Sequence, residues 1–175
     1  MNKASALTKK LGLEGHIKFF RTDANEYPCN YTNYFDIDIV LLIDILEHIE
    51  NPADMLEKLR PKLKKKSLCL VSVPTYNYER FFGKVFHKKA GHVRQGYILQ
   101  ELNNLFEKIG GRMIYYKYNT GLISNLGCAI YYRSISDNKY LTALKSLALY
   151  PFRFLDFYNN DRVSSSLFAA YSFNS

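Results

Sequence analysis

Apolar and polar residues are arranged along the chain in a way that predicts strands and helices in turn. Residues 35–43 form an almost continuous apolar run, which is typical of a strand buried on both faces of a parallel sheet. Shorter runs predict further strands over 16–22, 67–73, 112–118 and 166–173. Apolar residues at helical spacing predict helices over 3–13, 51–63 and 98–109.

Capping signals mark the ends of these predicted helices. Asn51 and Pro52 suit an N-cap and a first helical residue, and Pro61 predicts an irregular last turn. Ile98 stands where Ser or Thr would cap the next helix, although Glu101 keeps the other half of a capping box. The order of elements predicts a three-layer α/β sheet, whose last two strands pair antiparallel at one edge around an insertion over 121–160.

The charge of the chain limits the classes of partner that it could bind. A net charge of +8 fits an anionic surface, a nucleic acid or an anionic small molecule. The basic residues gather over 58–66, which suits a helix end, and over 84–94, where His87 and His92 stand among them. Because no recognised pattern interleaves these cations with stacking aromatics, we expect no nucleic acid, whereas peripheral contact with a membrane and oligomerisation stay open.

Cysteine usage and hydropathy indicate the compartment. The three cysteines are widely spaced without a CxxC pair, which favours reduced thiols over a zinc site or a disulfide framework, so no metal is expected. The first twelve residues carry no apolar secretory core, and no uncharged apolar run reaches the length of a membrane span. A cytoplasmic location is the resulting expectation.

The segment 43–48 is the best candidate for chemistry. In an open parallel sheet, ligands bind beyond the carboxyl ends of the strands, and this segment directly follows the apolar run. Asp44, Glu47 and His48 would then face a ligand crevice. The alternative is that the two acids only begin a helix and that His48 is a solvent-exposed or helix-packing residue.

Three segments together resemble class I S-adenosylmethionine-dependent methyltransferases, over about residues 5–120. The stretch FDIDIVLLIDILEHIENPADMLEKLRPKLKKKSLCLVSVP resembles the fourth strand of that family, its acidic-x-Leu-Glu-His turn, the following helix and the fifth strand. FFRTDANEYP is similar to the third strand with its Asp-Ala pair, and GHVRQGYILQELNNLFEKIGG to a His-x-Arg-x-Gly-Tyr segment that leads into a late helix. The resemblance implies the fold of that family, in which the strands of the sheet follow the order 3-2-1-4-5-7-6.

The resemblance also implies a cofactor site for S-adenosylmethionine. Asp23 would accept a hydrogen bond from the adenine amino group and the backbone of Ala24 would meet a ring nitrogen, unless Asp23 is only a turn residue. Ile43 would lie near the methionine part of the cofactor, with Asp44 beside it and Leu46 packed nearby.

A second group of candidates follows at 84–94. Arg94 and Lys89 would bind an anionic substrate, since Arg offers a bidentate fork to phosphate or carboxylate. His92, like His48, is a candidate catalytic base toward an acceptor hydroxyl. The alternative is a solvated basic loop that only orders the following helix.

One part of the family pattern is missing from the sequence. No strand followed by a glycine-rich turn precedes residue 23, so the chain resembles a Rossmann-like methyltransferase domain lacking its first two strands and cofactor loop. We therefore expect a single, partial, N-terminally truncated domain over 1–175, with 121–160 as a helical lid. The implied function is methyl transfer to a small-molecule, glycan or lipid-linked acceptor, impaired in this chain alone. The alternative is a non-catalytic remnant that binds a partner chain or an anionic surface.

Overall fold

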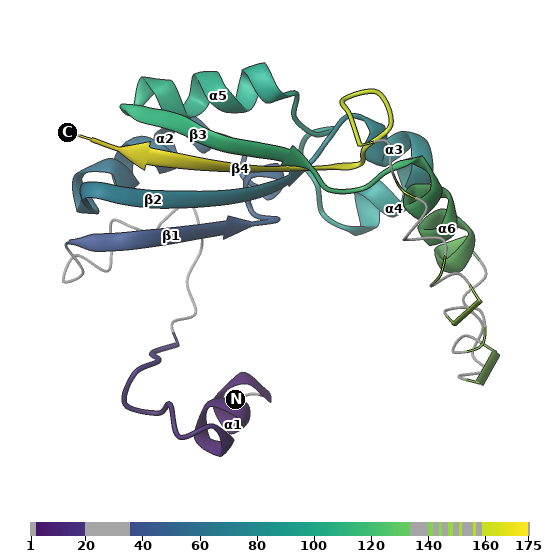
Figure 1. The fold of residues 1–175 in the computed structure, drawn as a ribbon, viewed down its shortest axis with the longest axis horizontal. Helices are drawn as coiled ribbons and strands as arrows, with labels where there is room; N and C mark the ends of the chain where they lie inside the picture. The colour runs from purple at the N-terminus through teal and green to yellow at the C-terminus, as the bar shows by residue number, and fades with distance from the viewer. Residues whose placement is uncertain are drawn as a thin grey trace.

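The computed structural model describes residues 3–19, 36–133, 140–141, 144, 147–148, 151, 156 and 159–174. Four strands form one sheet, and their bounds are β1 Ile37–Ile43, β2 Leu63–Pro74, β3 Gly111–Tyr118 and β4 Ser166–Phe173. The order in the sheet is β1-β2-β4-β3, with β1 and β2 parallel and β4 antiparallel to both of its neighbours (Figure 1). The expected antiparallel pair at one edge is therefore confirmed.

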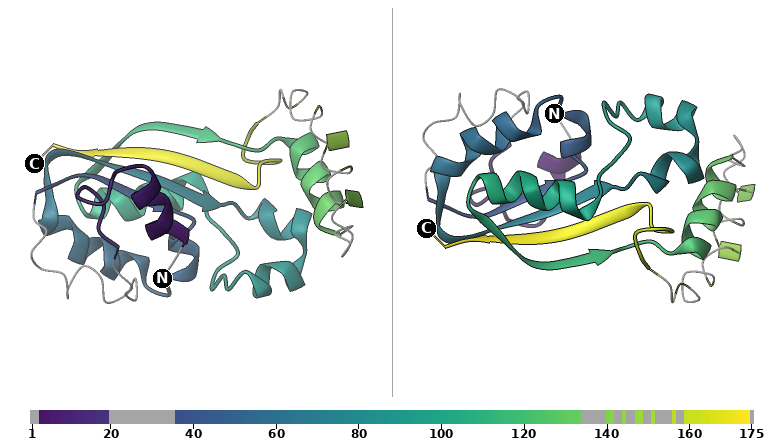
Figure 2. Two further views of the ribbon diagram at one scale, coloured as in Figure 1. Left: turned by 90° about the horizontal axis from the view of Figure 1, so that it is seen from below. Right: turned by 90° about the horizontal axis from the view of Figure 1, so that it is seen from above.

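Helices are distributed over the two faces and one end of this sheet. Their bounds are α1 Lys3–Lys10, α2 Pro52–Leu59, α3 Asn77–Phe82, α4 Lys84–Lys89, α5 Leu99–Lys108 and α6 Leu122–Arg133. The views agree that α2 and α5 lie on one side of the sheet and α1 on the other (Figure 2). The short helices α3 and α4, together with α6, lie at the end where β1 and β2 finish (Figure 1).

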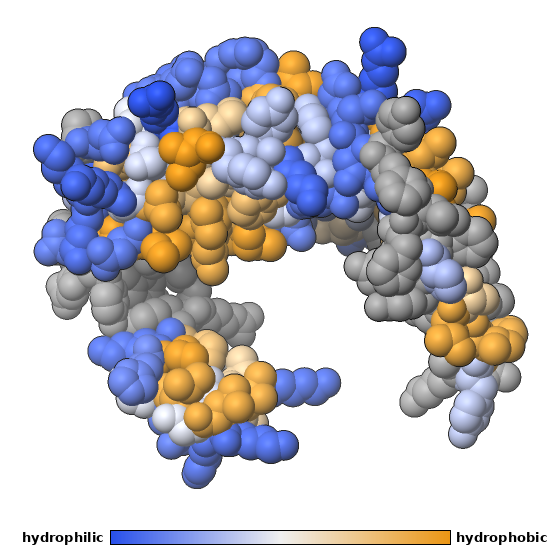
Figure 3. All heavy atoms as spheres, in the orientation of Figure 1, coloured by the Kyte–Doolittle hydropathy of each residue, from blue (hydrophilic) through white to orange (hydrophobic). Residues whose placement is uncertain are grey.

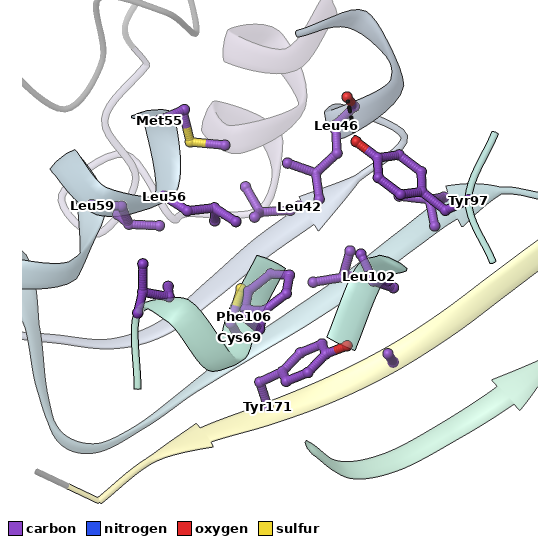
Figure 4. Close-up of a cluster of buried hydrophobic side chains, with 14 of the residues drawn as sticks. Leu42, Leu46, Met55, Leu56, Leu59, Cys69, Tyr97, Leu102, Phe106 and Tyr171 are labelled. Atoms are coloured by element: carbon purple, nitrogen blue, oxygen red, sulfur yellow. Dashed lines mark hydrogen bonds between the residues drawn. The ribbon is translucent and has the colours of Figure 1, made fainter. Parts of the chain in front are cut away.

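The core lies between the sheet and the pair α2 and α5 (Figure 4). Leu56 of α2 and Phe106 of α5 are fully buried against β2 and β4, and the Phe106 ring stacks on Tyr171 at a centroid distance of 4.0 Å. Each large apolar side chain buried in this way stabilises the fold by roughly 1.5–3 kcal/mol. Since these residues follow helical spacing on the helices and strand spacing on the sheet, the pattern itself selects the packed faces.

The predicted caps have the local structure that the sequence indicated. The Asn51 side chain accepts a hydrogen bond from the Asp54 N–H at 3.3 Å, and the residues around Pro61 form a 3-10 turn after α2. At α5, the Ile98 N–H donates to the Glu101 carboxylate at 3.2 Å, so the half capping box is formed.

Two expectations need correction. Residues 16–19 are not a strand, because His16 and Ile17 donate their N–H groups back to Leu13 in a turn. The apolar run of β1 is not buried on both faces either, since Ile39 and Leu41 are 58% and 59% exposed. Apolar side chains also gather on the surface below the sheet in Figure 3. Within the described residues, β1 is an edge strand that pairs only with β2.

Helices α3 and α4 were not predicted, and they follow β2 directly. They are six residues each, too short to show an amphipathic period in the sequence. Gly83 separates them with a backbone φ of 84°, a conformation that favours glycine.

The insertion over 121–160 begins with α6, which is bonded to Asp156 and to the segment before β4. The Asp156 carboxylate accepts hydrogen bonds of 3.0 Å from the N–H groups of Gly121, Ile123 and Ser124 and thereby caps α6. The buried Asn125 side chain donates to the Val163 carbonyl at 2.7 Å, close to the start of β4. The function of the insertion as a lid stays a prediction.

No helix within the described ranges is long and apolar enough to cross a membrane.

Candidate active site at the carboxyl ends of β1 and β2

The chain leaves β1 through a sharp turn at Asp44. Its backbone φ is 52°, its N–H donates to the Ser72 carbonyl at 2.9 Å, and its carboxylate accepts from the Ser72 hydroxyl at 3.3 Å. Because a non-glycine residue rarely adopts this left-handed conformation, the turn is held by β2 rather than by local preference. It leaves the Ile43 side chain 47% exposed and the Asp44 side chain accessible at the end of the sheet.

The next turn, Leu46–His48, lies between the core and this end of the sheet. Leu46 is fully buried, and its carbonyl accepts a hydrogen bond of 3.1 Å from the Tyr97 hydroxyl (Figure 4). The structure therefore places the Leu46 side chain in the core, where it fixes the turn from below.

Glu47 is the acid that the turn buries. Its side chain is 1% exposed, and burial raises its pKa to about 7, with the charge of Asp44 adding to the effect and the Glu47 N–H and His48 opposing it. Its Oε1 atom lies 3.8 Å from Nε2 of His48, and its Oε2 atom is buried without a hydrogen-bond partner. The sequence placed Glu47 with Asp44 and His48 at a ligand crevice, whereas the structure buries its side chain.

The two candidate catalytic histidines come together although they are separated by 44 positions in the sequence. The ring centroids of His48 and His92 lie 5.0 Å apart, and His87 and Tyr78 flank His92 at 4.7 and 5.1 Å. Burial lowers the pKa of His92, and the neighbouring His87 and His48 lower it further, so its imidazole is neutral at neutral pH. The buried His87 was seen in the sequence only as part of a basic cluster.

The segment His92–Tyr97 crosses both strand ends and is bonded to each. The Val93 N–H donates to the Glu47 carbonyl at 2.9 Å, and the Tyr97 N–H donates to the Pro74 carbonyl at 2.9 Å. Gly96 makes this crossing feasible, because a Cβ atom there would overlap the backbone of Thr75.

The two expected substrate contacts occupy different positions. The Arg94 guanidinium donates to the carbonyls of Ile49 and Glu50 at 2.8 and 3.1 Å and packs over the Tyr97 ring at 5.1 Å. It thus fastens the loop to the turn after β1. Lys89, by contrast, is an exposed residue at the end of α4. Asp23 and Ala24, the expected adenine contacts, lie outside the described residues.

A hollow of about 1200 Å³ lies elsewhere, between α5, β3 and residues 159–161. Its lining includes Asn103, Glu107 and Lys117 but none of the histidines. The candidate chemistry is therefore at the carboxyl ends of β1 and β2, where the convergent titratable groups are.

Comparison with solved structures identifies the fold. The chain superposes on a candidate sarcosine dimethylglycine methyltransferase from Galdieria sulphuraria with a TM-score of 0.60 at 10% identity, covering 97% of this chain and 64% of that one. An S-adenosylmethionine-dependent methyltransferase from Archaeoglobus fulgidus gives 0.54 at 12% identity, covering 94% and 72%. The plantazolicin methyltransferase BamL, solved with a triazolic desmethylPZN analog and SAH, gives 0.54 at 11%, covering 100% and 66%.

At these identities the likeness establishes a class I S-adenosylmethionine-dependent methyltransferase-like fold. The order β1-β2-β4-β3 matches the 4-5-7-6 half of the expected strand order. The chain spans less than two thirds of the length of the first of these structures, at 64%. No family model matches the sequence, and no curated protein matches it.

Proposed function

We propose that this chain contributes the strand ends and the acceptor side of a site for S-adenosylmethionine-dependent methyl transfer to a small molecule. The observation that carries the proposal is the turn at Asp44, which leaves Ile43 and Asp44 exposed at the end of β1, a few residues before His48, whose ring meets that of His92. In a sheet of this fold, that end of the strand is where ligands bind.

The residues present suit the expected cofactor. The exposed apolar side chain of Ile43 offers a contact for a thioether chain, and the Asp44 carboxylate offers an acceptor for an ammonium or hydroxyl group. Asp23 and Ala24 are proposed for the adenine end, and Leu46 supports the site from the core. The cofactor would supply an electrophilic methyl group, and the alignment of an acceptor with it supplies most of the rate.

The histidines are proposed to act on the acceptor. His92, neutral at neutral pH because of its burial and its neighbours, can take a proton from an acceptor hydroxyl or ammonium. Nδ1 of His48 lies 3.0 Å from the Gly91 carbonyl, which orients its ring toward His92. Arg94 acts by holding the loop that carries His92, whereas the exposed Lys89 suits an anionic group on the acceptor, such as that of a glycan or lipid-linked molecule.

Calorimetry with S-adenosylhomocysteine tests the cofactor part of this proposal. We expect saturable binding that weakens at least tenfold in Ile43→Glu, because the new carboxylate would enter the proposed thioether contact. Ile114→Glu is the matched control, since Ile114 is also an exposed strand residue, at 55%, but stands on β3 at the other edge of the sheet. Absence of binding at millimolar ligand, or equal losses in both variants, would refute the proposal.

A second candidate function rests on the exposed face of β1. Ile39 and Leu41 are more than half exposed beside a strand edge that has no partner among the described residues. Such an edge favours association with another chain. If the chain fails to bind S-adenosylhomocysteine but forms a stable assembly in light scattering, a non-catalytic binding module is the better account.

A further inference from the structure

Glu47 lies in one cluster with His48 and His92, and the proposed methyl transfer gives Glu47 no part. One ligand-type atom of each, a carboxylate oxygen or an imidazole nitrogen, lies within 4.8 Å of the other two. Among the described residues, this is the one set of three histidines, cysteines or acids that approaches so closely. The set joins the turn after β1 to the loop before α5, so the fold creates it from distant segments.

Unsatisfied polar atoms gather at the same point. Seven buried side-chain nitrogen or oxygen atoms in the described ranges have no hydrogen-bond partner, and three of these are Oε2 of Glu47, Nδ1 of His92 and Nε2 of the adjacent His87. Buried polar atoms are nearly always bonded to protein, water or an ion. Glu47 is 1% exposed, so its free oxygen is held within the protein next to two imidazoles.

His48 is oriented as a metal ligand is. Its Nδ1 atom lies 3.0 Å from the Gly91 carbonyl, which can only accept, so the proton resides on Nδ1 and the lone pair on Nε2. That Nε2 atom faces the Glu47 carboxylate at 3.8 Å. Metal-binding histidines characteristically donate their second ring N–H to a backbone carbonyl in this way.

We propose that Glu47, His48 and His92 bind a divalent transition-metal ion. One carboxylate and two imidazoles are a ligand set used by catalytic zinc and by non-haem iron, and they leave coordination positions open toward the strand ends. Two ligands of a tetrahedral zinc ion lie about 3.4 Å apart, so these ligand atoms, which lie within 4.8 Å of one another, close by up to about 1.4 Å through side-chain rotation on binding. Magnesium suits the set less well because it prefers oxygen ligands.

The metal would stand beside the acceptor position rather than the cofactor position. Under the proposed function, Asp44 would meet the cofactor, and His87 packs edge-on against His92. With the ion bound, His92 would be a ligand in place of a base: the ion would lower the pKa of a bound acceptor hydroxyl, whose proton would pass to solvent. Metal binding itself needs no cofactor, so it is tested without S-adenosylmethionine and its failure is distinct from failure of the proposed methyl transfer.

Zinc titration of chelator-treated protein, followed by calorimetry, tests the proposal. We expect one equivalent to bind, with at least a tenfold loss of affinity in Glu47→Gln and in His92→Asn. His16→Asn is the matched control, because His16 is exposed and far from the cluster in sequence, and we expect it to bind zinc as the unmodified protein does. Cobalt(II) as a second probe should give the visible spectrum of a site with nitrogen ligands.

The imidazole resonances of the unmodified protein provide a readout that does not depend on the folding of any variant. Addition of zinc should shift the signals of His48 and His92 and leave those of His16 in place. The proposal is overturned if zinc does not bind, if His16→Asn lowers the affinity as much as His92→Asn does, or if the signals of His48 and His92 do not move.

Discussion

Tyr97 is a sensitive point of this fold, because its hydroxyl joins the loop before α5 to the turn after β1. The side chain is 2% exposed, and its hydroxyl donates to the Leu46 carbonyl at 3.1 Å. Tyr97→Phe removes this hydrogen bond and keeps the ring under Arg94. At pH 7.5 we expect a loss of about 1–2 kcal/mol in the free energy of unfolding, since the variant leaves the carbonyl of the buried Leu46 with only the Ile49 N–H, at 3.4 Å, as its donor.

Alkaline pH should reduce the difference in stability between Tyr97→Phe and the unmodified protein. Burial raises the pKa of Tyr97 from 10.0 to about 12; Arg94 opposes the shift, and Glu47, Glu101 and Tyr76 add to it. Above pH 10 the unfolded chain releases the phenolic proton while the folded protein retains it, so ionisation of Tyr97 destabilises the fold between pH 10 and 12. At pH 10.5 the protein with Tyr97 loses about 0.8 kcal/mol of its free energy of unfolding in this way, and the phenylalanine variant has no such loss because it lacks the phenolic proton.

Urea unfolding of both proteins at pH 7.5 and 10.5 measures the effect. The variant should be less stable at pH 7.5 by about 1–2 kcal/mol, and the difference should narrow by about 0.8 kcal/mol at pH 10.5, because all other tyrosines and lysines are common to both. Tyr116→Phe, at a 49% exposed position, should change stability by less than about 0.5 kcal/mol at either pH. A constant difference between Tyr97→Phe and the unmodified protein would refute the reasoning.

Three further substitutions have expected outcomes. Asp156→Ala should cost about 1–2 kcal/mol in urea unfolding and speed hydrogen exchange at the start of α6, because it removes the acceptor of three backbone N–H groups; unchanged exchange there would contradict this. Gly96→Ala should cost more than about 3 kcal/mol or prevent folding, since its Cβ overlaps Thr75, and a normal melting temperature would contradict the close approach. Arg94→Lys should cost about 1–2 kcal/mol, because one ammonium cannot reproduce both the paired carbonyl bonds and the stacking on Tyr97; a neutral result would contradict that role.

Most of the sheet could be predicted because its signals are local. The apolar run of β1 and the capped helix after Asn51 need no distant partner to be recognised, and the antiparallel pair of β3 and β4 follows from their order. The burial of β1 could not be predicted in the same way. A continuous apolar run shows that a strand can be covered on both faces, whereas whether it is covered depends on what packs there, and Ile39 and Leu41 are exposed.

The site was only partly predictable for a related reason. The position of His48 just after a strand indicated where it would lie, but the contact between His48 and His92 depends on how the loop before α5 crosses the strand ends. Glu47 was expected to face the crevice, and its burial was missed because the sequence does not show that this turn packs its acid inward. Arg94 was expected to bind a substrate. Its actual hydrogen-bond acceptors are the backbone carbonyls of Ile49 and Glu50, about forty-five positions away, and the sequence cannot reveal them because every residue has a carbonyl.

The segment His92–Tyr97 explains why the histidine cluster is well positioned although it stands on a loop. Gly96 permits close approach to β2, Tyr97 bonds to Leu46, and Arg94 bonds to the turn after β1. His92 is thus fixed by three anchors that lie within five positions of it and contact different strand ends. Loops carry functional residues well when a rigid scaffold places them. Loosening any one anchor should therefore move His92 relative to His48, so Arg94→Lys should weaken zinc binding at the proposed site as well as destabilise the fold.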